Sequence, residues 1–308
     1  MKFATRINSF KSDTVRNVKE ILDLMGKVEG LDFVDLNYPE HFEGIDIKNM
    51  RELLARNGLK LNGVALRFRD EFIRGELGNA DAAVAAKALD LCKEAVDVCR
   101  DLGGEVVTIW LGYDGYDYSF QMDYVKAWKQ TEQAFRKVCD YGRDLRISIE
   151  YKPFQPRVYS LISSWGSTMS MLHDVGRDNL GITLDFCHML MKNENPAFSA
   201  AYLGERGKLY GVHLNDGAKF NDDGLMIGMV NFIQTLEFIY YLKRYRYDGV
   251  VYFDTFPVRE DAMQEVQANI RMMGKLEKLV ERIGMEEVAR VIQTNDAIEV
   301  QKMICNCF

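Results

Sequence analysis

Eight short runs rich in β-branched and aromatic residues recur along this chain, separated by segments in which apolar residues have helical spacing. The runs cover residues 3–7, 33–37, 61–66, 106–110, 147–150, 180–185, 209–213 and 250–254. Strands that alternate with helices form parallel sheets with crossover helices, and eight such strands close a barrel. An open doubly wound sheet would need fewer strands or a Gly-rich phosphate loop after the first strand, and no such loop follows it. The pattern predicts an α/β fold, a (β/α)8 TIM barrel.

The chain continues as helix beyond the eighth predicted strand. From Glu260 onward apolar residues keep helical spacing, with breaks near Gly284 and Asn295. Barrels of this length commonly form one unit. We therefore expect a catalytic barrel domain over residues 1–283 and a C-terminal helical extension over residues 284–308 that packs on the barrel.

Charge and composition limit the classes of partner. The net charge of −7 argues against a nucleic-acid backbone or an anionic membrane as the main partner. No apolar run of about 18 residues and no basic-then-apolar leader is visible. The six cysteines form no C-x-x-C pair, so reduced thiols are expected. These features predict a cytoplasmic globular protein that binds neither nucleic acid nor membranes.

Four consecutive predicted strands end in a carboxylate or an imidazole. These residues are Glu150, Asp185, His213 and Asp254. Function in such barrels lies at the C-terminal ends of the strands, and neighbouring strands are about 4.8 Å apart, so the four side chains can converge on one ion. Three carboxylates and one imidazole suit Mn²⁺ or Mg²⁺ better than structural Zn²⁺. Each residue alone could be a polar residue where a strand meets water, but four in succession favour a metal site.

Three further polar side chains are expected near this ion. Glu150 and Lys152 share a face of an extended chain, so they form either a salt bridge or the beginning of a site. His188 follows Asp185 by three residues and is expected above the ion, where it would bind a substrate hydroxyl, join a second metal position or have a structural role. His41 follows the second strand and is a candidate general base with a pKa near the working pH, with a surface role as the alternative.

Aromatic and basic residues near the strand ends are candidate substrate contacts. Trp110 and Tyr113 lie on or just after the fourth strand, where rings pack on the C–H faces of sugars or simply cap a barrel. Arg157 could bind a phosphate or carboxylate, or pair with neighbouring acids. No helix-start glycine nest follows the last two strands, which favours an unphosphorylated sugar.

The loop after the seventh strand is rich in Asp and Asn. If it is extended, Asn221 and Asp223 share a face and are the better candidates for the rim of the site. Asp216 and Asp222 are interpreted as solvated loop residues.

Four segments carry a resemblance to a known family. They are Glu150-x-Lys-Pro, Asp185-x-x-His, His213-Leu-Asn-Asp, and the run from Tyr247 to Asp254 with the Thr-Phe-Pro that follows. Together they resemble the xylose-isomerase-like barrel superfamily, which includes sugar isomerases of the xylose and rhamnose type and ketose 3-epimerases. The resemblance covers roughly residues 100–265, and before that it concerns mainly the fold.

The resemblance implies roles for particular residues. The four strand-end residues match the shared ligands of a divalent metal, with Mn²⁺ preferred and Mg²⁺ or Co²⁺ as alternatives. Lys152 matches the lysine that contacts the sugar oxygen in aldose–ketose isomerases, and His188 matches a histidine that touches substrate or a second metal.

Two positions depart from the superfamily pattern. Asp254 stands where the epimerases carry a glutamate base, which disfavours the simplest epimerase mechanism. Asn221 stands where the two-metal isomerases have an acidic ligand, which favours one metal.

We therefore predict a metal-dependent sugar isomerase or epimerase that uses proton or hydride transfer beside a sugar carbonyl. Its predicted catalytic residues are Glu150, Lys152, His188, Asp254 and His41. Its predicted substrate-binding residues are Trp110, Arg157, Tyr113 and Asn221. We expect a small-molecule carbohydrate or glycoside as partner, and a homo-oligomer.

Three other functions fit the same fold. The chain is also similar to the catalytic (alpha) subunit of a C-glycoside deglycosidase, a lyase that releases aglycone from a 3-oxo-glycoside and works with a small second subunit. A metal-dependent nuclease for abasic DNA would need more ligands and a basic groove, and the net charge of −7 opposes it. A sugar-binding barrel without catalysis is the fourth interpretation.

Overall fold

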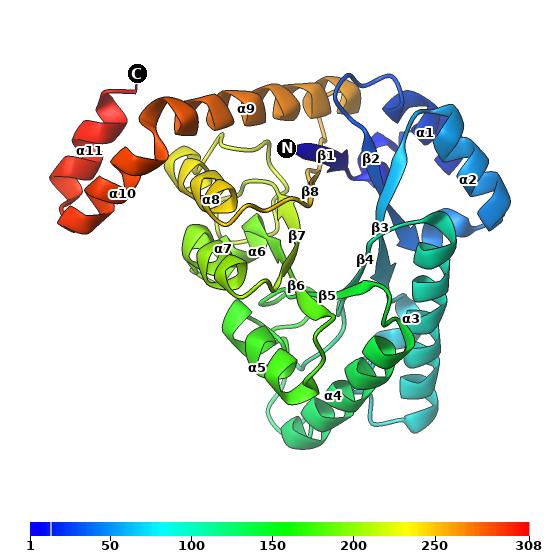
Figure 1. Ribbon diagram of the computed structural model, residues 1–308. Helices are drawn as coiled ribbons and strands as arrows, with labels where there is room; N and C mark the ends of the chain where they lie inside the picture. The colour runs from blue at the N-terminus through cyan, green and yellow to red at the C-terminus, as the bar shows by residue number, and fades with distance from the viewer. Residues whose placement is uncertain (13, 308) are drawn as a thin grey trace.

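Eight parallel strands wind around a nearly closed barrel in a computed structural model, which describes residues 1–12 and 14–307 (Figure 1). They are β1 (Lys2–Thr5), β2 (Phe33–Tyr38), β3 (Lys60–Arg67), β4 (Val106–Trp110), β5 (Arg146–Glu150), β6 (Leu180–Asp185), β7 (Leu209–Leu214) and β8 (Val250–Phe253). The sheet order is β1-β8-β7-β6-β5-β4-β3-β2, so the described residues form a ladder everywhere except between β1 and β2. This confirms the predicted (β/α)8 barrel.

Helices connect each strand to the next on the outside of the barrel (Figure 1). They are α1 (Val18–Met25), α2 (Ile47–Arg56), α3 (Ala82–Leu102), α4 (Tyr124–Tyr141), α5 (Trp165–Val175), α6 (Phe186–Met191), α7 (Pro196–Glu205) and α8 (Phe232–Arg244). Short 3-10 helices lie at Ile7–Phe10, Glu40–Phe42 and Asp70–Phe72. Among the described residues, no helix has both the length and the apolar character needed to cross a membrane.

Three helices follow the last strand, which confirms the predicted C-terminal helices. They are α9 (Ala262–Ile283), α10 (Met285–Thr294) and α11 (Ala297–Cys305). Val288, Val291 and Ile304 of the last two helices pack against the apolar core. The division of the chain into domains at residue 284 stays a prediction.

Strand ends agree with the sequence analysis to within a few residues. The first strand is shorter than predicted, because the chain turns into a 3-10 helix at Ile7. Helix α3 begins directly after Asp81, because the Asp81 side chain accepts a hydrogen bond from the backbone N–H of Ala83 and so caps the helix. Gly103 ends that helix with a positive φ of 76°, which glycine adopts without strain.

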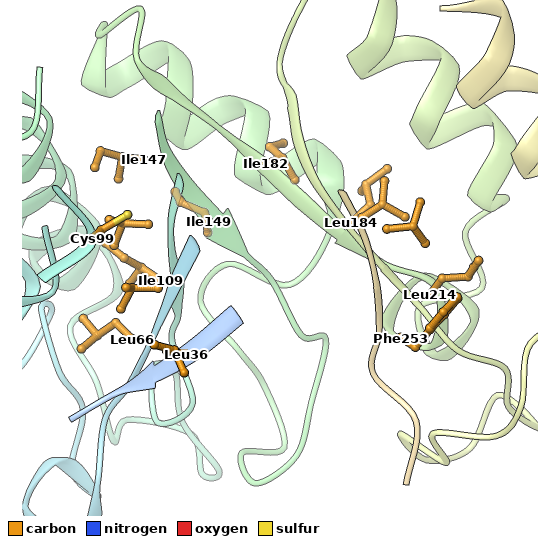
Figure 2. Packing of buried hydrophobic residues seen from close by; sticks show 14 of the residues in the cluster. Leu36, Leu66, Cys99, Ile109, Ile147, Ile149, Ile182, Leu184, Leu214 and Phe253 are labelled. Carbon is orange, nitrogen blue, oxygen red and sulfur yellow. The ribbon is translucent and has the colours of Figure 1, made fainter. Parts of the chain in front are cut away.

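Alternate residues of each strand serve two different environments. Most outward-facing residues are large and apolar and pack under the helices; Figure 2 labels several of them, such as Leu66, Ile149 and Leu184, together with Cys99 of α3. The inward-facing residues of the middle strands are small and polar: the Ser148 hydroxyl lies 2.7 Å from that of Thr183, which lies 3.4 Å from that of Thr108. Because side chains two residues apart share a face, the next inward positions are Trp110, Glu150 and Asp185. These three side chains therefore lie together at the end of the barrel where the C-terminal ends of the strands meet, which we call the mouth.

The wall of the barrel is tightly packed at Gly63. A Cβ at this position would lie 2.4 Å from the backbone oxygen of Val106 on the neighbouring strand, which cannot move cheaply. We expect Gly63→Ala to lower the free energy of unfolding by about 2 kcal/mol. Gly274→Ala in α9, where nothing lies within 4 Å, should leave stability unchanged or raise it by up to about 1 kcal/mol. Urea unfolding measures both, and equal effects of the two variants would contradict the account.

Candidate active site

The four strand-end residues meet at one buried point. Glu150 and Asp185 end β5 and β6, His213 is the last residue but one of β7, and Asp254 directly follows β8. One ligand atom from each of these four residues lies within 4.8 Å of the others, and all four residues are buried. A divalent ion placed between these ligand atoms would be within reach of all four side chains.

Buried polar atoms of this cluster have no hydrogen-bond partner among the described residues. They include Nδ1 of His213 and Oδ1 of Asp254. Burial raises the pKa of Asp185 to about 7, and the charges of Asp222 and Asp254 add to the increase. Crowded and unpaired buried carboxylates are unfavourable unless a cation or a proton compensates them. The donor set and its unpaired atoms therefore fit a divalent metal ion.

The charges within the cluster are strongly linked. Oε1 of Glu150 lies 3.3 Å from Nδ1 of His213 and 3.8 Å from Nδ1 of His188. Burial opposes ionisation of Glu150, but the positive charges of His213 and His188 outweigh it and lower the pKa of Glu150 to about 2. Glu150 therefore stays ionised and available as a metal ligand or proton acceptor.

Asp222 lies in the site, contrary to the interpretation of this residue as solvated loop. Asp185, His188 and Asp222 form a second group whose ligand atoms lie within 4.8 Å of one another. Oδ2 of Asp222 lies 3.3 Å from Nε2 of His188 and accepts a hydrogen bond from Lys152 Nζ at 2.9 Å. Asp222 thus supplies a carboxylate one residue after Asn221, so the amide at residue 221 does not by itself argue against a second metal, and the number of metal ions stays a prediction. The ammonium of Lys152 already compensates this carboxylate.

The structure leaves the two predicted rim residues outside the cluster. Asn221 is exposed and accepts a hydrogen bond from the Gln155 amide at 2.9 Å. Asp223 accepts a hydrogen bond from the backbone N–H of Ala218 at 2.7 Å. Asp216 is fully buried, rather than solvated, and accepts backbone hydrogen bonds that fold its own loop.

Two cations lie near the Trp110 ring at the mouth. The Lys152 ammonium is 5.9 Å from the centroid of its ring, and the Arg67 guanidinium is 5.7 Å from it. Arg157 forms an ion pair with Asp117 at 2.9 Å in the loops above the mouth. Tyr113 packs, partly buried, against the apolar core. The structure therefore brings Trp110 and Lys152 together, whereas Arg157 pairs with a loop acid.

His41 does not have the pKa expected of a general base. Its Nδ1 accepts a hydrogen bond from the backbone N–H of Asn37 at 2.9 Å, and its Nε2 lies 3.1 Å from Oδ1 of Asn8. Burial lowers the pKa of His41 to about 3, so the expectation of a value near the working pH is wrong. A neutral imidazole with both nitrogens engaged positions the loop after β2.

Two kinds of residue at the site were not predicted from the sequence. Asn215, Arg6 and Arg67 lie at inward-facing positions at the strand ends, and counting in steps of two from His213, Ala4 and Ala65 would have found them. Asp222 lies in an irregular loop, and no periodic signal identifies it.

The fold and the cluster together define a (β/α)8 barrel with a candidate metal site at the C-terminal ends of its strands. Over residues 25–276 the chain matches the family described as xylose isomerase-like TIM barrel. This match covers most of the chain, and the protein belongs to that family.

Relatives with sugar isomerase and epimerase names share this barrel. A xylose isomerase of Thermus thermophilus is 27% identical over 234 residues, which are 73% of this chain and 60% of the relative. The chain therefore spans about 60% of the length of that curated relative. The structure of an L-ribulose 3-epimerase has a TM-score of 0.72 at 18% identity, covering 92% of this chain and 96% of the other. A D-tagatose 3-epimerase-like protein has a TM-score of 0.68 at 21% identity, covering 92% of this chain and 99% of the other.

Metal addition should stabilise the protein through the four-residue cluster. At a Mn²⁺ concentration of about 100 times Kd, binding adds about 2.7 kcal/mol, which corresponds to a rise in Tm of about 5 °C for a chain of this size. Asp185→Asn should abolish this rise, and Asp223→Asn, a neighbour of Asp222 outside both groups, should keep it. Differential scanning calorimetry with and without Mn²⁺ at pH 8 measures the effect. An equal rise in Asp185→Asn would place the ion elsewhere.

Asn215 should control metal affinity without binding the metal. Its amide donates to Asp185 Oδ2 and to the backbone oxygen of Asp254, both at 3.2 Å, and its oxygen accepts from the backbone N–H of Cys187 at 2.8 Å. We expect Asn215→Ala to weaken Mn²⁺ binding roughly 10- to 100-fold, as measured by titration calorimetry. Asn49→Ala, at an exposed position on α2, is the control. Lowered stability with unchanged Mn²⁺ affinity would show that Asn215 has a purely structural role.

Proposed function

We propose that this protein is a divalent-metal-dependent sugar isomerase or epimerase that moves a proton or hydride beside a sugar carbonyl. The observation that carries the proposal is the buried convergence of three carboxylates and one imidazole, with the Lys152 ammonium 2.9 Å from the adjoining Asp222. Membership of a family with sugar isomerases among the chain's relatives supports it.

The residues that would hold the metal are Glu150, Asp185, His213 and Asp254. This oxygen-rich donor set favours Mn²⁺, with Mg²⁺ or Co²⁺ as alternatives. When bound, the ion would stabilise negative charge on a sugar oxygen as hydrogen leaves the neighbouring carbon. We propose one metal per chain, because Lys152 already compensates the charge of Asp222 in the second group.

Lys152 is proposed to donate a proton or hydrogen bond to the sugar oxygen. Two contacts fix its position: the ion pair with Asp222 and the face of Trp110. A lysine held in this way loses little conformational freedom when substrate binds, which favours reaction. The exposed parts of the Trp110 ring would pack on the sugar.

His188 is proposed to orient a substrate hydroxyl. Its Nδ1 lies 2.9 Å from the backbone oxygen of Tyr151, an acceptor only, so Nδ1 carries a hydrogen. Burial lowers the pKa of His188, but the charges of Asp185 and Asp222 outweigh burial and raise it to about 9. Nε2 is therefore a donor in the metal-free protein.

Glu150 is the proposed proton acceptor. It stays ionised, it is buried away from water, and it lies two residues from Lys152, so one side chain can accept a proton while the other donates. Asp254 is the second candidate, because its Oδ1 has no hydrogen bond within the described part of the chain. We further propose a small-molecule sugar substrate, a homo-oligomeric assembly and a cytoplasmic location.

Turnover should depend on Lys152 independently of metal binding. In Mn²⁺-loaded protein incubated with a panel of aldoses and ketoses, we expect a new sugar product by chromatography. Lys152→Met should lower kcat by about 10²- to 10⁴-fold while keeping Mn²⁺ bound. Glu150→Gln should lose both metal and turnover, and Lys219→Met, exposed on the same loop as Asp222, should keep both.

Two results would contradict this function. Release of aglycone from a 3-oxo-glycoside, with no conversion of free sugars, would identify a lyase acting on oxidised glycosides. Sugar binding without turnover of any substrate would identify a binding protein.

A further inference from the structure

Two arginines line the inner face of the barrel mouth without a full set of partners. Arg67 is the last residue of β3, and its guanidinium makes no hydrogen bond or ion pair with any other described residue; it only packs on Trp110, 5.7 Å from the ring centroid. Arg6 follows β1, and its buried Nε makes no hydrogen bond, although it lies 3.5 Å from Oδ1 of Asp254.

Both arginines point toward the proposed metal site. Arg6 continues the inward-facing series of β1, which runs alongside β8 and Asp254. The Arg67 guanidinium shares the Trp110 ring with the Lys152 ammonium, which places it at the same end of the barrel as the cluster. Burial lowers the pKa of Arg67, but the charges of Asp254, Tyr252 and Glu150 outweigh burial and raise it. A half-buried guanidinium with five donors and no acceptor from the protein can bind the oxygens of a ligand without giving up a hydrogen bond to the protein.

With a divalent metal bound, the mouth would carry an excess of positive charge. The charged side chains there are four carboxylates and three cations: Glu150, Asp185, Asp222, Asp254, Lys152, Arg6 and Arg67. A divalent ion leaves one positive charge in excess even with both histidines neutral. A ligand with a single negative charge would neutralise the mouth.

Two further acidic residues near the mouth, Glu40 and Asp35, do not supply the negative charge that would neutralise it. Glu40 is already paired with Lys11 and Arg69. Asp35 on β2 pairs in register with Gly63, four residues before Arg67 on β3, so it lies deeper in the barrel than Arg67. Its Oδ1 already accepts a hydrogen bond from the Asn62 amide at 2.7 Å.

From this geometry we infer that the substrate is a sugar that carries a carboxylate, and that Arg67 binds this carboxylate with help from Arg6. The inference rests on the proposed function and adds its substrate class. The planar guanidinium matches the two oxygens of a carboxylate. The excess of one positive charge is the minimum, reached with both histidines neutral, and a carboxylate matches it; a phosphate, which carries nearly two charges at pH 7, is the alternative that the test distinguishes.

The test compares ligands that differ only at one carbon. Titration calorimetry of Mn²⁺-loaded protein would measure binding of D-glucuronate, D-glucose and D-glucose 6-phosphate. We expect D-glucuronate to bind about tenfold or more tightly than D-glucose. Arg67→Met should remove this preference by weakening D-glucuronate binding alone, and Arg67→Lys should retain part of it because the charge remains.

Controls separate this inference from the proposed function. Arg259→Met, at an exposed position beyond β8, should leave all three affinities unchanged. Equal binding of D-glucose and D-glucuronate, equal weakening of both by Arg67→Met, or tightest binding of D-glucose 6-phosphate would overturn the carboxylate assignment and leave the metal-dependent function standing. Failure of the folded protein to bind Mn²⁺ would overturn the proposed function itself.

Discussion

Repulsion among buried carboxylates is the constraint on which the rest of this site depends. Glu150, Asp185 and Asp254 are taken out of water at the ends of β5 and β6 and just after β8. Burial raises the pKa of Asp185 and of Asp254, and the charges of Asp254 and Glu150 raise that of Asp185 further. Only compensating positive charge makes such a cluster favourable. His213 and the neighbouring Arg6 supply part of it, and the proposed divalent ion supplies the rest.

The barrel turns a simple alternation of residues into this cluster. Outward-facing residues such as Ile149 and Leu184 hold the strands against the helices, so the inward-facing neighbours are free to be polar (Figure 2). A one-residue shift of register would exchange the two sets. The packing of the apolar core is therefore what keeps the carboxylates aimed at one point, and Asn215 holds Asp185 in place from the adjoining strand.

Much of this arrangement could be predicted from the sequence, for a physical reason. Apolar runs mark strands, and the polar residue that ends each run has to lie at the mouth, so Glu150, Asp185, His213 and Asp254 could be identified without a structure. Asp222 could not, because the path of an irregular loop depends on contacts distant in sequence. His41 was misjudged because a sequence does not show burial, which lowers its pKa to about 3. Arg67 lies one residue beyond the strand predicted over residues 61–66, and the observed strand extends to include it.

The most direct test of the central claim is anomalous diffraction from crystals of the protein soaked in Mn²⁺. The account predicts one strong manganese peak at about 2.1 Å from ligand atoms of Glu150, Asp185, His213 and Asp254. Absence of a peak between these four side chains, or a peak bound only by other residues, would contradict it.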